Sequence, residues 1–344
     1  MHVKVDAYNS QQIIVYSGET DANIVSDQIT QLNLTLYATS SGMGGISITV
    51  KWSDTPFPTF HWQDSPNSPI MTGSLPFEIN GVAYPYVIYD NGIYKMYYTG
   101  AGNSQRFELG YATSPDGHNW TKTSYPIFSP SVSGFDNYNV GSAKVIKVGN
   151  SYRMYYMARN QEGVYSIGLA TSTDGINWTR RSTPVLTKSL SWEISIRPGD
   201  IVLHNDKYYF YYYSYDPQNT AIGLAISSDG INFVKEPNPI IVPTFTWEDN
   251  GICYPSVIYD NNKFVMVYHT FPNCKNIGYA ESIDGKNWTT QPNPIFSKEM
   301  TTNNWVNRFT SVNLLKINNE YRIYYSATMN SLYYYQVGVI SKNI

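Results

Sequence analysis

The sequence contains few charged residues and no excess of positive charge. Lys and Arg together number 23 and Asp and Glu number 26, so the formal net charge is −3, and only 14% of the 344 residues are charged. A protein that binds nucleic acid through its phosphates usually carries a basic surface. We therefore expect no nucleic-acid partner.

Long apolar runs are also missing. A membrane-spanning helix needs about 18 or more consecutive apolar residues, and no segment of this sequence approaches that length. The opening residues, MHVKVDAYNS, lack the basic segment and apolar core of a signal peptide. We expect no membrane span. A mature chain from which a signal peptide had been removed would also lack these features at its start.

Cysteine is scarce as well, since the chain has only Cys253 and Cys274. Two cysteines are too few for a disulfide-rich scaffold or a structural zinc cluster, and we expect no metal and no cofactor. Both cysteines are predicted at the same end of one β-hairpin. They can form a single disulfide bridge, which would indicate an oxidising location, or remain two free thiols.

Aromatic residues, in contrast, are abundant: they make up 15% of the chain, and 32 residues are tyrosine. Tyrosine and β-branched residues favour strands over helices, and asparagine favours turns. A tyrosine side chain also suits the face of a sugar, because its ring is apolar and its hydroxyl is polar. Most of the tyrosines are expected simply to fill β-sheets.

One motif is written four times. The segment LATSTDGINWTRRSTPVL, residues 169–186, has counterparts that begin at Tyr111, Leu224 and Tyr279. Its Asp-Gly aspartates, at spacings of 58, 55 and 55 residues, are Asp116, Asp174, Asp229 and Asp284. A fixed period of this length predicts a repeat architecture. A catalytic role would require four equivalent sites, so we interpret the motif as part of a repeated scaffold.

A second motif precedes each Asp-Gly segment and occurs once more near the end. Its copies are VIYDNGIYKMYY from Val87, VIKVGNSYRMYY from Val145, IVLHNDKYYFYY from Ile201, VIYDNNKFVMVY from Val257 and LLKINNEYRIYY from Leu314. Each copy reads as two strands joined by a turn of Asn, Gly or Asp. A third strand and a fourth, which begins at the tryptophan, follow. Four strands in about fifty residues form a propeller blade.

The fifth unit ends after its third strand, at VGVISKNI. The segment FHWQDSPNSPIM, from Phe60, matches the missing fourth strand, with Trp62 in the place of Trp120. A ring closed by strands from both ends leaves no exposed sheet edge. We predict an all-β fold, a five-bladed β-propeller over residues 56–344 that is closed by an N-terminal strand.

Residues 1–55 lie outside the repeat and form a separate N-terminal β-segment in this interpretation. QLNLTLYAT and ISITVKWS alternate apolar and polar residues on either side of SSGMGG, which predicts a hairpin with one buried face. This segment either packs on the propeller or docks the protein onto a larger assembly.

Two recurring features are interpreted as scaffold. In the Asp-Gly turn, the aspartate can accept backbone N–H bonds, glycine supplies the positive φ, and the Trp or Phe that follows wedges between blades. An aromatic-acid pair also recurs just before the inner strands, as Phe77-Glu78, Phe135-Asp136, Trp192-Glu193 and Trp247-Glu248, with Trp305 alone in the fifth blade. We interpret this pair as a packing and capping device.

The residues at the starts of the innermost strands differ from blade to blade. Such variation is expected where one ligand contacts each blade through a different side chain. One aligned column reads Tyr84, Ser142, Pro198, Tyr254 and Ser311, and the column two residues later reads Tyr86, Lys144, Asp200, Ser256 and Asn313. The predicted substrate-binding residues at this channel mouth are Tyr84, Tyr86, Lys144, Arg197, Asp200, Tyr254, His269, Arg308 and Asn313.

Simpler interpretations stay open for these residues. A narrow channel can hold assorted polar side chains and water without any ligand. His269 can be a hydrogen-bonded sheet residue, as lone histidines usually are. Arg197 and Arg308 can clamp a carboxylate or sulfate, or they can pair with Asp200 and nearby glutamates.

The segments AYPYVIYDNGIYKMYYTG, CYPSVIYDNNKFVMVYHT and IGLATSTDGINWTR resemble the five-bladed glycoside hydrolases of family 43 and relatives such as the family 32 fructosidases. The resemblance implies three carboxylates that enter the channel from successive blades as base or nucleophile, pKa modulator and acid. The family pattern has aspartate directly before the proline of the first blade. Here that residue is Tyr84, and Tyr254 holds the equivalent position in the fourth blade.

Of the three carboxylates, only Asp200 in the third blade is recognisable. Our leading hypothesis is therefore a glycan-binding propeller on a glycosidase-like scaffold, outside a cell or on the surface of a virus or phage particle, with a carbohydrate as its partner. The alternative is an active glycoside hydrolase with relocated acids, drawn from Asp200, Glu78 and Glu193. A third hypothesis is a structural spacer anchored in an assembly through residues 1–55.

Overall fold

The computed structural model describes residues 62–103, 106–329 and 334–343, together with three N-terminal strands. The chain divides into two compact units, residues 1–59 and residues 60–344. The boundary expected from the sequence lies at residue 55. No helix of the described residues is long and apolar enough to cross a membrane.

The first unit contains a three-stranded antiparallel sheet in the order β1-β2-β3. Its strands are β1 (His2–Tyr8), β2 (Ile14–Asp21) and β3 (Tyr37–Ala38). The hairpin predicted from residues 31–39 and 46–53 lies outside the described residues, except for β3.

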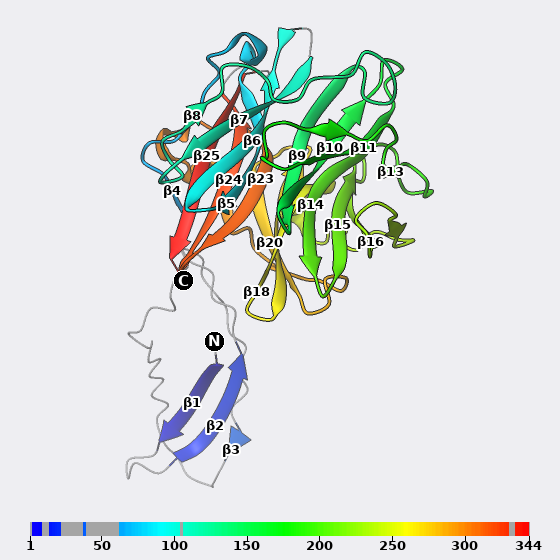
Figure 1. The fold of residues 1–344 in the computed structure, drawn as a ribbon. Coiled ribbons are helices and arrows are strands. Elements are labelled where there is room, and N and C mark those ends of the chain that lie inside the picture. Colours follow the sequence, from blue (N-terminus) through cyan, green and yellow to red (C-terminus); the bar gives the residue numbers. More distant parts are fainter. Residues whose placement is uncertain are drawn as a thin grey trace. The chain divides into compact units, whose positions relative to one another are not determined.

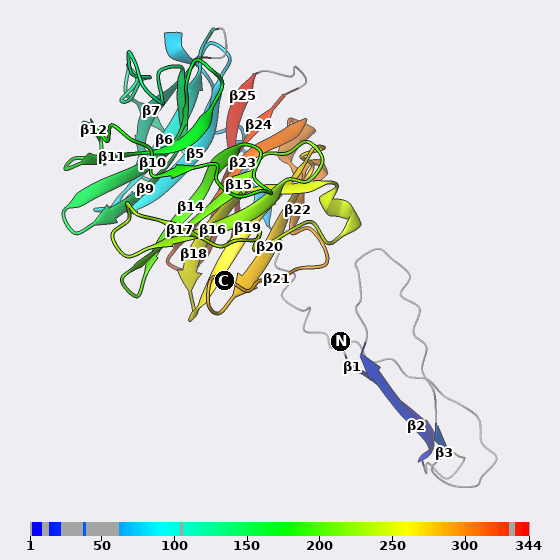
Figure 2. The ribbon, with the colours of Figure 1, turned by 90° about the vertical axis from the view of Figure 1, so that its right-hand side faces the viewer.

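The second unit is a five-bladed β-propeller, as predicted (Figures 1 and 2). Blade one is built from β5 (Val82–Asp90), β6 (Ile93–Ala101), β7 (Phe107–Ser114) and β8 (Thr121–Lys122). Blade two contains β9 (Asn139–Val148), β10 (Ser151–Arg159), β11 (Tyr165–Ser172), β12 (Thr179–Arg180) and the short β13 (Leu186–Thr187). Each outermost strand follows directly after the aromatic residue of its repeat, which is tryptophan except for Phe233 in blade three.

The remaining blades follow the same plan. Blade three contains β14 (Ile196–His204), β15 (Lys207–Ser214), β16 (Ala221–Ser227) and β17 (Val234–Lys235). Blade four contains β18 (Gly251–Asp260), β19 (Lys263–Phe271), β20 (Asn276–Ser282), β21 (Thr289–Thr290) and β22 (Phe296–Ser297). Short 3-10 turns precede several inner strands: η1 (Pro76–Glu78), η3 (Thr246–Glu248), η4 (Lys298–Met300) and η5 (Thr302–Asn304).

Blade five joins the two ends of the propeller. Its strands are β23 (Arg308–Ile317), β24 (Glu320–Thr328), β25 (Tyr335–Asn343) and β4 (Gln63–Asp64), and β4 pairs with β25. The Asp64 carboxylate accepts bonds from Thr302 N and Tyr325 Oη, both at 2.8 Å. The predicted closure by an N-terminal strand is confirmed, and it places blade one beside blade five (Figures 1 and 2).

The Asp-Gly turn has the scaffold role that the sequence predicts. In blade two, Asp174 Oδ1 accepts the N–H groups of Ile176 and Asn177, both at 2.8 Å. Gly175 has φ +79, and a Cβ atom there would lie 2.7 Å from the hydroxyl of Tyr97 in blade one. Glycine is therefore required both for the backbone conformation and for the approach of the neighbouring blade.

The aromatic residue after each turn packs against a tyrosine of the preceding blade. The pairs, with ring centroids 5.7–6.0 Å apart, are Trp120 with Tyr324, Trp178 with Tyr97, Phe233 with Tyr155 and Trp288 with Tyr211. The rings meet edge to face, the arrangement that aromatic pairs prefer. These contacts join neighbouring blades at four of the five junctions of the ring.

The aromatic-acid pairs cap the loops that lead into the first four blades. Glu78 is buried and accepts bonds from Tyr98 Oη at 2.6 Å, from Lys122 Nζ at 2.6 Å and from two backbone N–H groups. Glu193 is held in the same way by Lys235 Nζ and by two backbone N–H groups. Each carboxylate is thus used by its own blade.

Candidate functional site

Every inner strand contains a β-bulge at the column that begins with Tyr84 or one residue away from it. The strand pairing shifts between Ala83 and Tyr86 in blade one and between Cys253 and Ser256 in blade four, with equivalent shifts in the other three blades. Bulges bend a strand and redirect its side chains. Here they occur where the inner strands enter the channel.

Three of these bulge residues have a left-handed backbone although none is glycine. Their φ angles are +51 at Tyr84, +46 at Ser142 and +50 at Tyr254. Such conformations cost free energy and concentrate at functional positions. Three blades therefore maintain an unfavourable backbone geometry at a column whose residues differ between blades.

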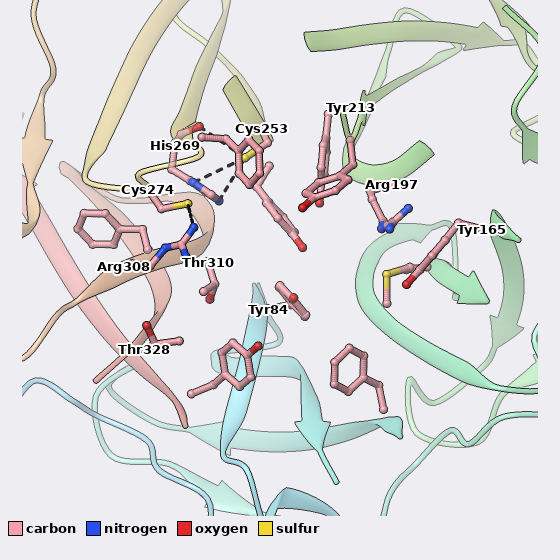
Figure 3. Close-up of a pocket in the computed structure, with 17 residues that line it drawn as sticks. Tyr84, Tyr165, Arg197, Tyr213, Cys253, His269, Cys274, Arg308, Thr310 and Thr328 are labelled. Atoms are coloured by element: carbon pink, nitrogen blue, oxygen red, sulfur yellow. Dashed lines mark hydrogen bonds between the residues drawn. The ribbon is translucent and has the colours of Figure 1, made fainter. Parts of the chain in front are cut away.

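A pocket of about 360 Å³ opens at this end of the channel (Figure 3). Five of the nine predicted binding residues line it, namely Tyr84, Arg197, Tyr254, His269 and Arg308. No Asp or Glu belongs to the lining that the structure describes. The pocket therefore combines aromatic rings with positive charge and contains no carboxylate.

Stacked rings form the centre of the pocket wall. Tyr84 and Tyr254 lie nearly parallel, with centroids 5.3 Å apart and planes 10° apart. Tyr254 stacks in turn on His269, at 5.3 Å and 16°. Burial raises the pKa of both tyrosines well above its usual value, so the hydroxyls are neutral hydrogen-bonding groups at ordinary pH.

His269 is a neutral sheet residue in this arrangement. Its Nδ1 lies 2.9 Å from the Thr270 carbonyl oxygen, and Cys253 Sγ lies 3.6 Å from both ring nitrogens. Burial lowers the pKa of His269 to about 4. At neutral pH the ring supplies stacking surface and no charge.

The two pocket arginines project from inner strands β14 and β23. The Arg197 guanidinium lies over the Tyr165 ring, 3.3 Å from its centroid, and Nη1 donates to Ser195 Oγ at 2.5 Å. Arg308 Nη2 donates to the Pro272 carbonyl oxygen at 2.5 Å. Neither arginine has a carboxylate within 4.0 Å among the described residues, so the predicted alternative of a partner such as Asp200 is not what the structure shows.

The other four predicted residues, Tyr86, Lys144, Asp200 and Asn313, are buried and do not line the pocket. Asp200 Oδ1 accepts from Tyr86 Oη at 2.8 Å, and Oδ2 accepts from Ser256 Oγ at 2.7 Å. Asn313 Oδ1 accepts from Val87 N at 2.8 Å. The Asp200–Ser256 and Asn313–Val87 bonds connect neighbouring blades, whereas the Asp200–Tyr86 bond joins the inner strands of blades three and one.

Lys144 shares this buried region with Asp200. Its ammonium lies over the Tyr86 ring, 5.2 Å from the centroid, and burial lowers its pKa to about 8. Burial raises the pKa of Asp200, and the positive charge of Lys144 partly opposes that rise. A buried charge needs a partner of opposite sign, and these two supply it to each other.

The candidate catalytic acids are thus separated from the pocket. Glu78 and Glu193 are bound to Lys122 and Lys235, both at 2.6 Å, and Asp200 is bonded to Tyr86 and Ser256. None of the three lines the pocket. The structure brings no pair of them together across the mouth.

The two cysteines are free thiols, both buried and both part of the pocket wall. Burial raises the pKa of each, which keeps them protonated and poorly nucleophilic. Within the described part of the chain, no three His, Cys, Asp or Glu side chains are grouped as a metal site requires.

Most of the remaining lining comes from strand ends that carry no sequence signal. These residues are Phe107, Met157, Tyr165, Tyr213, Tyr215, Phe271, Phe309, Thr310, Thr328 and Tyr335. Among 32 tyrosines nothing in the sequence distinguishes those that face the pocket. Only the alignment of the blades could have located them, by placing the ends of second and third strands at the same rim.

The fold and the pocket define the class of this protein: a five-bladed β-propeller of the kind found in glycoside hydrolases and related phosphorylases. The chain belongs to glycoside hydrolase family 130. The model of this family, described as beta-1,4-mannooligosaccharide phosphorylase, matches residues 84–196 and 198–273, more than half of the chain.

Two curated relatives share 30% identity with this chain. One is an uncharacterized protein of Mycobacterium tuberculosis, aligned over 154 residues that cover 42% of this chain and 50% of that protein. The other is the 1,2-beta-oligomannan phosphorylase of a Thermoanaerobacter species, aligned over 195 residues, 53% of this chain and 62% of the relative. The chain thus spans half to three fifths of the length of these relatives.

Solved structures show the same fold. A thermostable family-43 glycoside hydrolase superimposes with a TM-score of 0.64 and 22% identity, over 75% of this chain and 88% of that one. A structure from the family 130 mannoside phosphorylases, a family containing hydrolases of beta-1,2 mannosidic linkages in Candida mannan, has a TM-score of 0.63 and 17% identity. It covers 84% of this chain and 95% of that chain.

Proposed function

We propose that this protein binds a glycan in the channel-mouth pocket and does not cleave it. The observation that carries the proposal is the composition of the lining, with stacked Tyr84 and Tyr254, two arginines and no carboxylate. Tyrosine rings offer apolar faces to a sugar, and their hydroxyls offer hydrogen bonds. A pocket of about 360 Å³ lies within the size range of small-ligand sites.

The absence of acids from the lining argues against hydrolysis at this pocket. Glycosidases use two carboxyl groups that flank the scissile bond, about 5–9.5 Å apart. The described pocket supplies none, and tyrosine stands before the proline in both blade one and blade four. Asp200 is buried and does not line the pocket, and its two carboxylate oxygens accept hydrogen bonds from Tyr86 and Ser256.

The first experiment tests binding. Mannooligosaccharides with β-1,2 and β-1,4 linkages are the natural first probes, given the names of the family and the relative, followed by a broad glycan array. The double variant Tyr84→Ala, Arg197→Gln should lose binding, while Tyr125→Ala, which removes an exposed tyrosine outside the pocket, should retain it. Glycan binding that survives the double substitution would refute the proposal.

The second experiment tests for cleavage. The same oligosaccharides are incubated with the protein, with and without inorganic phosphate. We expect neither reducing sugar nor sugar phosphate to accumulate. Release of either product that is abolished by Asp200→Asn, but not by Glu299→Gln in an outer turn, would support the relocated-acid hydrolase or phosphorylase instead.

A location outside the cell or on a virus particle, with residues 1–55 as a docking segment, remains part of this proposal. It is supported by the binding-type pocket and by the division of the chain into two units. Detection of the native protein in the culture medium or in purified particles, rather than in cell lysate, would test it.

A further inference from the structure

The pocket carries positive charge that the protein itself does not neutralise. Several cations elsewhere in the described residues lie beside acids, as in Lys122–Glu78, Lys235–Glu193 and Arg180–Asp136 at 2.6–2.7 Å. Arg197 and Arg308 line the pocket and have no carboxylate within 4.0 Å in the described part of the chain. This contrast occurs in a protein whose formal net charge is −3.

A third arginine adds to the charge at the same rim. Arg159, at the end of β10, lies over Tyr138 and Tyr165, 4.6 and 5.5 Å from the ring centroids. Tyr165 therefore has Arg197 and Arg159 beside it. Among the described residues no carboxylate lies within 4.0 Å of Arg159 either. Tyrosine rings stabilise Arg159 and Arg197 and leave their charge in place.

Both pocket guanidinium groups are held so that donors remain available. Hydrogen bonds to the protein involve Nη1 of Arg197, with Ser195 Oγ and the Ile196 carbonyl, and Nη2 of Arg308, with the Pro272 carbonyl and Cys274 Sγ. A guanidinium has five N–H donors, so most of them are not used by these bonds. Figure 3 shows the two arginines on opposite sides of the pocket.

A partly buried cation gains most from an anion that it can contact directly, because the solvent that would screen it is reduced. Planar guanidinium groups match the oxygens of carboxylate, sulfate and phosphate. His269 supplies no compensating or additional charge at neutral pH, since burial lowers its pKa to about 4. The two arginines are therefore the charges that an incoming ligand meets in the described lining.

We propose that the glycan bound in this pocket is acidic, carrying a carboxylate, sulfate ester or phosphate ester that Arg308 or Arg197 contacts, while the stacked tyrosines contact the sugar rings. This inference rests on the proposed glycan-binding function and names the ligand class for that site. It extends the function from sugars in general to sugars that bear an oxyanion.

The test is a calorimetric titration of the full chain with matched pairs of oligosaccharides: a uronic-acid oligomer and its methyl ester, a sulfated oligomer and its desulfated form, and a phosphorylated and a plain mannooligosaccharide. One acidic member should bind at least about tenfold more tightly than its neutral partner, as expected for a charge-assisted hydrogen bond. The advantage should shrink with increasing salt.

Variants then assign the effect to the pocket. Arg308→Gln and Arg197→Gln should each reduce the ratio of affinities for the acidic and the neutral oligosaccharide. In the double variant this ratio should be close to one. Arg181→Gln, at an exposed arginine outside the pocket, should leave it unchanged. The salt dependence of the unmodified protein serves as an independent readout should an arginine variant fold poorly.

The outcomes separate this inference from the function on which it rests. Equal binding of neutral and acidic members, abolished by the Tyr84 and Arg197 double substitution, would overturn the acidic ligand and leave glycan binding intact. Binding of inorganic phosphate or sulfate alone, with no sugar of any kind bound, would overturn both. An acidic preference that survives loss of both arginines would also refute the inference.

Discussion

At the scale of single residues, the sequence identified residues near the mouth of the channel. It did not distinguish those that line the pocket from those that are buried between the inner strands. Tyr84 and Tyr86 lie two positions apart in the sequence, a spacing that places residues of a regular strand on one face, so the sequence pattern grouped them into one site. In the structure Tyr84 lines the pocket, whereas Tyr86 is buried against Asp200. The β-bulge that separates them is a product of strand register, which a single sequence does not specify.

His269 leads to a prediction about acid stability. Its pKa falls from 6.5 in the unfolded chain to about 4 in the fold, so the fold favours the neutral ring. The corresponding stabilisation is fully present above pH 6.5 and is lost as the pH falls toward 4, to a total of about 3 kcal/mol. Urea unfolding at pH 7 and pH 4.5 should show a smaller decrease in His269→Gln than in the natural protein.

The comparison between the two proteins is essential here, because Asp116 and other acids with lowered pKa also lose stabilisation in acid. Those losses occur equally in the natural protein and in the variant, and the difference isolates His269. Identical slopes of unfolding free energy against pH would show that the ring is not held neutral by the fold.

At the scale of the structural element, the sequence predicted more. The Asp-Gly turn, the hairpins and the Trp or Phe directly before each outer strand all follow from local chemistry repeated in register, and the structure confirms them. What the repeat could not show is the partner of each turn. The contact between Gly175 and Tyr97 joins residues of two different blades.

That contact can be measured with a pair of glycine substitutions. Gly175 and Gly92 have the same φ of +79, but a Cβ atom at Gly92 would meet nothing within 4 Å. Alanine at either position costs about 1–2 kcal/mol through the left-handed backbone. In Gly175→Ala the free energy of unfolding should fall further, by about 1–3 kcal/mol, because the new methyl group clashes with Tyr97. Equal midpoints of chemical unfolding for the two variants would exclude a blade-to-blade role for the turn.

At the scale of the whole molecule, the blade count and the closure were predictable because both depend on chain order. Spacings near 55 residues gave five units, and the likeness of the segment after Phe60 to the fourth strands gave the missing strand. The N-terminal segment gave no comparable signal, since its predicted hairpin had no repeat to support it. The pocket volume and charge emerged only when strand ends from all five blades were brought together.

Two truncations test the closure. Removal of residues 1–59 keeps β4 and should leave the thermal unfolding of the propeller nearly unchanged. Removal of residues 1–66 also deletes β4 and Trp62, which is 5% exposed. Loss of a buried tryptophan costs about 3–5 kcal/mol, so the unfolding temperature should drop by many degrees. Similar melting curves for both truncations would mean that β4 does not close the ring.

The same closure has a mechanical consequence. Whatever residues 1–59 are attached to, a pulling force on them enters the propeller through β4, which has only two residues. Its pairing to β25 and the bonds of Asp64 would bear the load in shear before any complete blade does. Stretching from this end should therefore open blade five first, before the sheets of the other four blades unfold. The strand that closes the ring is then also its weakest point under load.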